Sequence, residues 1–126
     1  MNKKVLYLSA TIAYALLIFL LSSFSGDKTE KLYLFKHSDK IIHLLEYAVL
    51  CFLVSKALSS TLKENVRRYT GLIAVVISLL YAITDEFHQS FVPGRYASID
   101  DIFADGIGAV ISQIILYIKD VKGDLR

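Results

Sequence analysis

The chain has 126 residues, 55% of them hydrophobic, and a mean hydropathy of +0.52, which is high for a water-soluble domain. This length accommodates one domain at most, residues 1–126. A formal net charge of only +2 leaves no electrostatic footprint for nucleic acid, so nucleic-acid binding is excluded. The single cysteine, Cys51, lies in an apolar run and is expected to pack as a small hydrophobic residue.

The first apolar run covers residues 5–24 and follows Lys3 and Lys4. As a helix it is long enough to cross a membrane, since about 20 residues at about 1.5 Å each cover roughly 30 Å of hydrocarbon. A cleaved signal peptide is the alternative, because a lysine pair, a hydrophobic stretch and Ser23-Phe24-Ser25 resemble its three regions. The run exceeds the usual signal core of about 7 to 15 residues, which favours a retained helix.

Three more apolar runs follow, separated by a mixed-charge connector at residues 26–40, a hydrophilic loop at residues 61–68 and the chain break at Pro93-Gly94. Lipid offers no water to pair with backbone groups, so runs of this length are expected to be helices. The predicted fold is all-α: a multi-pass membrane protein with a bundle of four transmembrane helices. These helices are expected at about residues 5–24, 40–59, 69–88 and 101–118.

Lysine and arginine predict the orientation, because they are enriched in cytoplasmic loops. With the N-terminus inside, nine of the fourteen basic residues fall on the cytoplasmic side and five on the outer side. Both termini are therefore predicted to be cytoplasmic. The outer five are Lys28, Lys31, Lys36, Lys40 and Arg95.

This topology brings polar sequence from three spans to one membrane face. The start of the second span, the end of the third, the Pro-Gly corner and the start of the fourth all lie on the predicted outer face. The second and third spans carry polar residues at i, i+4, i+7 and i+8, and the fourth carries polar or small residues at i, i+4, i+7 and i+11. Each set lies on one face of a helix. Because lipid disfavours polar stripes, they are expected to face one another around a cavity that opens outward. The stripes are Asp39, His43, Glu46 and Tyr47; Tyr81, Asp85, His88 and Gln89; and Asp101, Asp105, Gly108 and Ser112.

Some of these residues have plain structural explanations. Asp39 and Asp101 could cap helix N-termini, Arg95 could extend to the interface, and Glu86 could face lipid headgroups. His43, Asp85 and Asp105 lie one to two turns inside apolar spans, where ionisable groups are usually functional.

The cluster suggests acid–base or hydrogen-bonding chemistry, because burial and neighbouring charges shift carboxyl and imidazole groups toward neutrality. His43, Asp85 and His88 are the predicted catalytic or hydrogen-bonding core. No HxxxH or HExxH pair is present to set metal geometry, so neither a metal nor a cofactor is expected. The predicted ligand-binding residues are Asp39, Lys40, Tyr47, Glu86, Gln89, Arg95, Asp101 and Asp105.

At these positions the sequence resembles the VanZ-like family of small bacterial membrane proteins. The matching motifs are Ser-Asp-Lys-x-x-His-x-x-x-Tyr at 38–47, Tyr-x-x-x-Asp-Glu-x-His-Gln-x-Phe-Val-Pro-Gly-Arg at 81–95 and Asp-x-x-x-Asp-x-x-Gly at 101–108. Ser22-Ser23 at the end of the first span also fits, and the resemblance covers about residues 5–118. One departure is Asp105, where many members carry Asn.

The resemblance implies a bacterial cell-envelope protein in a family named after a member associated with teicoplanin resistance. The expected function is binding or modifying an envelope lipid, a lipid-linked intermediate or a glycopeptide-type amphiphile at the outer face, with a contribution to glycopeptide tolerance. The alternatives are a non-enzymatic accessory or scaffold protein and, with less support, a small transporter, since no polar path continues through the inner half. The small residues Ala104, Gly108 and Ser112 allow close helix packing, either within the chain or in a homo-oligomer.

Overall fold

The computed structural model describes residues 2–31 and 33–124, and across these residues the chain contains helices and no strand. Four helices are long and apolar enough to cross a membrane, which confirms the predicted all-α membrane bundle. They are α1 (Lys3–Ser22), α3 (Ser38–Thr61), α5 (Thr70–Gln89) and α6 (Ile99–Asp124). The protein is thus a multi-pass membrane protein.

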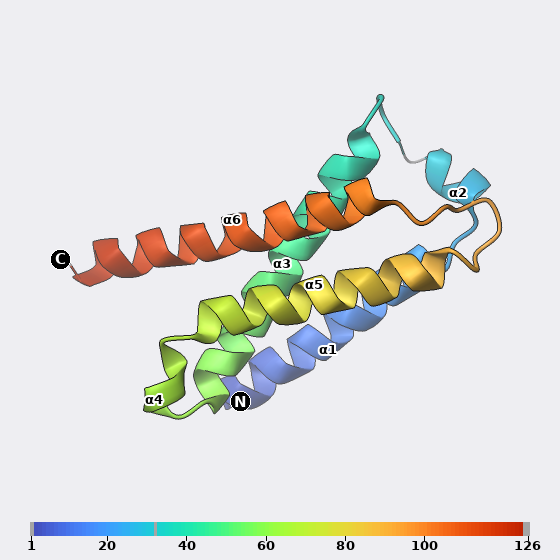
Figure 1. Cartoon of the computed structure of the whole chain (residues 1–126). Helices are drawn as coiled ribbons and strands as arrows, with labels where there is room; N and C mark the ends of the chain where they lie inside the picture. Colours follow the sequence, from blue (N-terminus) through green and yellow to red (C-terminus); the bar gives the residue numbers. More distant parts are fainter. Residues whose placement is uncertain (1, 32, 125–126) are drawn as a thin grey trace.

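Two connections predicted only as a polar connector and a hydrophilic loop each contain a short helix. These are α2 (Gly26–Glu30) and α4 (Glu64–Arg67). In Figure 1, α2 lies beside the α5–α6 connection at one end of the bundle, whereas α4 and both chain ends lie toward the other end. The end with α2 is called the polar end below, because α3, α5 and α6 bring their buried histidine and carboxyl side chains to it.

Helix α3 is the centre of the bundle, since it packs against α1, α5 and α6, and most extensively against α6. Its Tyr47 is fully buried, and the neighbouring core is built from small side chains such as Ala74, Ala82 and Ala109. Most large apolar side chains of the spans are exposed on the bundle surface. Such a surface suits a lipid environment, in which close packing rather than hydrophobic burial holds helices together.

Gly108 of α6 lies at a close backbone contact with α3. A Cβ atom at this position would overlap the backbone carbonyl of Leu44 on α3. Ala104 and Ser112 lie one turn away on either side and are buried as well. The small residues therefore serve α3–α6 packing within one chain.

The polar end is closed by a contact between two segments that are far apart in the sequence. The backbone N–H of Gly26 donates to the carbonyl of Pro93 at 3.0 Å. A Cβ at Gly26 would overlap the carbonyl of Gly94, whose φ of 76° favours glycine. This approach holds α2 over the bundle beside the corner between α5 and α6.

Candidate functional site

The first feature of the polar end is a group of ion pairs that joins α3 to α6. His43 is 6% exposed and its Nδ1 lies 3.0 Å from Oδ1 of Asp105, which is 1% exposed. The other ring nitrogen, Nε2, lies 3.9 Å from Oδ2 of Asp101. Lys40 pairs with Asp101 and also with Asp39, at 3.3 Å. His43 thus stands between two carboxylates of one face of α6.

The second feature is a chain of hydrogen bonds that runs inward from the Pro-Gly corner. Nε of Arg95 donates to Oε1 of Gln89 at 3.0 Å, and Nε2 of Gln89 donates to Oδ2 of Asp85 at 2.9 Å. Gln89 and Asp85 are buried, whereas Arg95 is half-buried at the mouth. A carboxylate inside the span is therefore linked to a cation at the membrane surface through one amide.

Glu86 belongs to the interior and does not face the headgroup region. Its side chain is 2% exposed, and Oε2 accepts a hydrogen bond from the backbone N–H of Ser98 at 2.8 Å. This bond fixes the start of α6 to the end of α5. The sequence-based alternative that Glu86 simply faces lipid headgroups does not fit this burial.

Several carboxylate oxygens at the polar end have no hydrogen-bond partner among the described residues. They are buried oxygens of three residues, namely Oδ1 of Asp85, Oε1 of Glu86 and Oδ2 of Asp105. A buried acceptor without a donor costs about 1 to 3 kcal/mol. This concentration within one site therefore indicates that the site accepts donors or cations from outside the chain.

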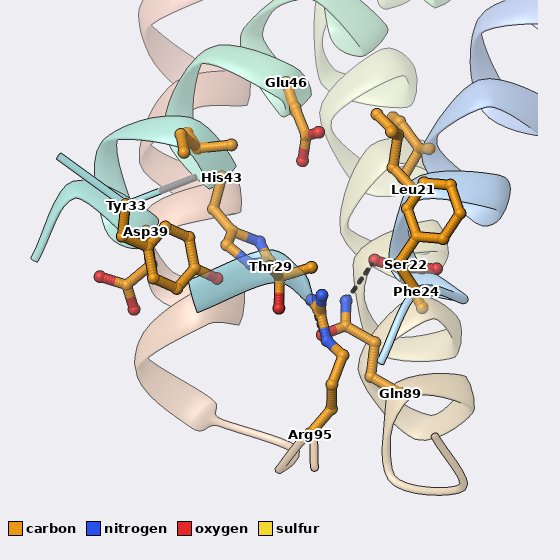
Figure 2. Close-up of a pocket in the computed structure, with 13 residues that line it drawn as sticks. Leu21, Ser22, Phe24, Thr29, Tyr33, Asp39, His43, Glu46, Gln89 and Arg95 are labelled. Carbon is orange, nitrogen blue, oxygen red and sulfur yellow. Dashed lines mark hydrogen bonds between the residues drawn. The ribbon is translucent and has the colours of Figure 1, made fainter. Parts of the chain in front are cut away.

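A cavity of about 140 Å³ connects these groups with helix α1 (Figure 2). One wall is apolar and comes from Ile18, Leu21 and Phe24, together with Ile42 of α3. The opposite wall is polar, and α2 and the residues after it cover the opening. The polar lining consists of Ser22, Thr29, Tyr33, Asp39, His43, Glu46, Asp85, Gln89 and Arg95.

A second hollow of about 230 Å³ lies beside the first and shares Tyr33, Asp39, His43, Gln89 and Arg95 with it, among other residues. It adds Lys40 and Asp101 and is bounded by Gly26 and Gly94 of the closing contact. Burial raises the pKa of Tyr33 above its ordinary value, so its phenol keeps its proton and can donate into the site. The two hollows together form one site with a narrow apolar part and a wider polar part.

Four of the predicted site residues line neither hollow, namely Tyr47, Glu86, His88 and Asp105. Nε2 of His88 lies 3.0 Å from Oγ of Ser23, and its ring stacks on Phe19 with centroids 4.5 Å apart. His88 therefore contacts α1 and lines neither hollow. Tyr47 and Asp105 lie behind the lining, Tyr47 in the core and Asp105 in contact with His43.

The structure brings the other predicted residues together, and it adds some that the sequence did not single out. Thr29 and Tyr33 cover the site, although their connector carries no helical polar stripe that could have revealed them. Glu46 was predicted to lie on the polar stripe of α3 and lines the cavity. The sequence does not distinguish Ile18 and Leu21 of α1 from residues that face lipid.

A family model described as VanZ/LLP1 matches residues 5–120, nearly the whole chain. The chain belongs to the VanZ/LLP1 family. Searches of curated proteins and of solved structures found no significant match. The resemblance to VanZ-like proteins that the sequence motifs indicate is thereby confirmed.

Membership of the VanZ/LLP1 family supports a membrane protein of a family linked to glycopeptide resistance. The matched region covers nearly all of the four membrane spans and contains every residue that lines the two hollows. For this VanZ/LLP1 protein, the polar end is accordingly the candidate functional site.

Proposed function

We propose that this VanZ/LLP1 protein binds the head of an envelope amphiphile at its polar end, on the outer face of a bacterial membrane. The ligand would be a lipid-linked envelope intermediate, a glycolipid or a glycopeptide-type amphiphile. Through this binding the protein would contribute to glycopeptide tolerance. The observation that carries the proposal is the two-sided cavity, with apolar α1 side chains on one wall and the carboxylates of Asp39, Glu46 and Asp85 on the other.

The chemistry of the site matches such a head. Sugar hydroxyls and peptide N–H groups are donors, and they would satisfy the unpaired oxygen of Asp85, which lines the cavity. Arg95 at the mouth suits an anionic group such as a phosphate. The apolar wall of α1 belongs to a helix whose outer side chains are exposed to lipid, so an acyl or prenyl chain could remain in the membrane.

Conservative substitutions in the polar wall test this proposal. Asp85→Asn keeps an acceptor for Gln89 but removes the carboxylate, and Arg95→Gln removes the cation at the mouth. Each should weaken binding of a polyprenyl-phosphate glycolipid or of teicoplanin roughly tenfold or more, because a hydrogen bond to a charged group contributes about 1.5 to 3 kcal/mol. Binding is measured by native mass spectrometry on protein in nanodiscs.

Asp120→Asn and Arg68→Gln are matched controls, since both residues are exposed and lie away from the polar end. These variants should bind like the wild type. Teicoplanin susceptibility of cells expressing equal amounts of each variant provides the second measurement. If neither probe binds the wild type, amphiphile binding is rejected. If binding and thermal stability fall together in the Asp85 and Arg95 variants, the scaffold function is favoured instead.

The proposed orientation has its own test. Ser90 is exposed just after α5 at the polar end, and Asn65 is exposed in α4. A Ser90→Cys variant should react with a membrane-impermeant maleimide on intact cells, whereas Asn65→Cys should react only after permeabilisation. Cys51 is buried and contributes little background. The reverse labelling pattern would place the polar end in the cytosol and contradict an outer-face site.

A further inference from the structure

One group of side chains at the polar end has the composition and spacing of a metal-binding site. His43, Glu86 and Asp101 are all buried, and each offers a ring nitrogen or carboxylate oxygen within 4.8 Å of the other two. A cation with nitrogen and oxygen ligands about 2.1 Å away keeps neighbouring ligand atoms roughly 3 to 4 Å apart. Small side-chain rotations are therefore sufficient to close the three groups around one ion.

The orientation of the His43 ring also fits a ligand. An ionised carboxylate can only accept hydrogen bonds, so Nδ1 of His43, 3.0 Å from Asp105, carries the proton. When a metal ion replaces the second ring proton, Nε2 presents its lone pair to the ion, and this nitrogen makes no hydrogen bond among the described residues. A carboxylate that holds one histidine nitrogen while the other binds the ion is the usual arrangement around metal-bound histidines.

Glu86 provides an independent reason to expect a cation. It is 2% exposed, and its Oε1 is buried without a hydrogen-bond partner among the described residues, while Oε2 accepts from Ser98. Asp101 has one oxygen paired with Lys40 and the other directed toward Nε2 of His43. Each carboxylate thus keeps one oxygen that the chain does not fully satisfy.

The charges around the site also favour a bound cation. The residues that line the two hollows or lie directly behind them include two basic side chains other than histidine, Lys40 and Arg95, and seven carboxyl groups, of Glu30, Asp39, Glu46, Asp85, Glu86, Asp101 and Asp105. Uncompensated buried charge costs several kcal/mol per ion. A divalent cation would offset part of this excess.

We infer that His43, Glu86 and Asp101 bind a divalent transition-metal cation, with Asp105 orienting His43. One imidazole and two carboxylates suit Mn²⁺ or Zn²⁺ and leave coordination positions for water or a ligand. His43 and Asp101 line the wider hollow, so these positions face the space that also contains Arg95. The sequence motifs predicted no metal, because ligands that come from three different helices do not form a motif of fixed spacing along the chain.

The test uses purified full-length protein in nanodiscs, dialysed against a chelator and titrated with Mn²⁺. The decrease of the free Mn²⁺ electron paramagnetic resonance signal measures binding, and Zn²⁺ is added as a competitor. The wild type should bind about one ion. Electron spin echo modulation should show a coupled imidazole nitrogen. Neither the polyprenyl-phosphate glycolipid nor teicoplanin is added, so the result is independent of the function proposed above.

His43→Gln, Glu86→Gln and Asp101→Asn should each weaken Mn²⁺ binding at least tenfold, and His43→Gln should also abolish the nitrogen coupling. His37→Asn and Glu64→Gln are the matched controls. Both residues are exposed, and the φ of 68° at His37 is readily adopted by Asn. These two variants should bind like the wild type.

Failure of the wild type to bind Mn²⁺ or Zn²⁺ at millimolar concentration would overturn the metal site. Mn²⁺ binding by the three ligand variants that is as tight as that of the wild type would also overturn the metal site. If a ligand variant does not fold, the wild-type spin echo spectrum decides, because bound Mn²⁺ without a nitrogen coupling is not at His43.

Discussion

Gly108→Ala should lower the stability of the bundle by about 1 to 3 kcal/mol, even though alanine is the better helix former. A Cβ at this position overlaps the carbonyl of Leu44, which is backbone and cannot rotate away. Helix α6 must therefore shift away from α3, its most extensive packing partner. The Tm in detergent, measured by circular dichroism, is expected to fall by several degrees. A larger residue such as Leu should leave little folded protein.

Gly123→Ala is the control in the same helix, because nothing lies within 4 Å of a Cβ built there. This change should be neutral or slightly stabilising, since Gly in a helix costs roughly 0.5 to 1 kcal/mol relative to Ala. A Gly108→Ala protein as stable as Gly123→Ala would mean that α3 and α6 do not approach as closely as the structure describes.

Asp105→Ala should cost about 3 to 5 kcal/mol, the range measured when one partner of a buried ion pair is removed. The substitution leaves Nδ1 of His43 without its acceptor in a position that water does not reach, since Asp105 is 1% exposed. Asp105→Asn should cost much less, because its amide oxygen can still accept from Nδ1. Unfolding in a series of denaturing detergent mixtures measures both variants.

Adding His43→Leu to Asp105→Ala provides the internal control for this pair. The double variant removes the orphaned imidazole, so it should be more stable than the sum of the two single changes predicts. Additive losses would indicate that His43 and Asp105 stabilise the bundle separately, and the hydrogen bond between them would then contribute little.

The spacing of polar residues predicted part of the site because a helical period determines which residues share a face. Asp39 and His43 on α3, Asp85 and Gln89 on α5, and Asp101 and Asp105 on α6 are each four residues apart, and the structure brings all six to the polar end. His88 illustrates the limit of this reasoning. Successive residues are rotated by roughly 100°, so residues three and four positions after Asp85 lie on opposite sides of it. Gln89 therefore faces α3 and the hollows, whereas His88 contacts Ser23 and Phe19 of α1.

The amino-acid sequence was sufficient to predict the four spans, the family resemblance and the location of the polar residues at one end of the bundle. Hydrophobic length and alternating chain direction are sufficient for these features, since each span must return the chain to the opposite face. The pairing of residues, such as that of His43 with Asp105, is visible only in the three-dimensional structure. The same is true of the burial of Glu86 and of the closure of the site by α2 through Gly26 and Gly94. These features depend on the rotation and separation of neighbouring helices. Close backbone contacts set both quantities, and periodicity within one segment does not encode them.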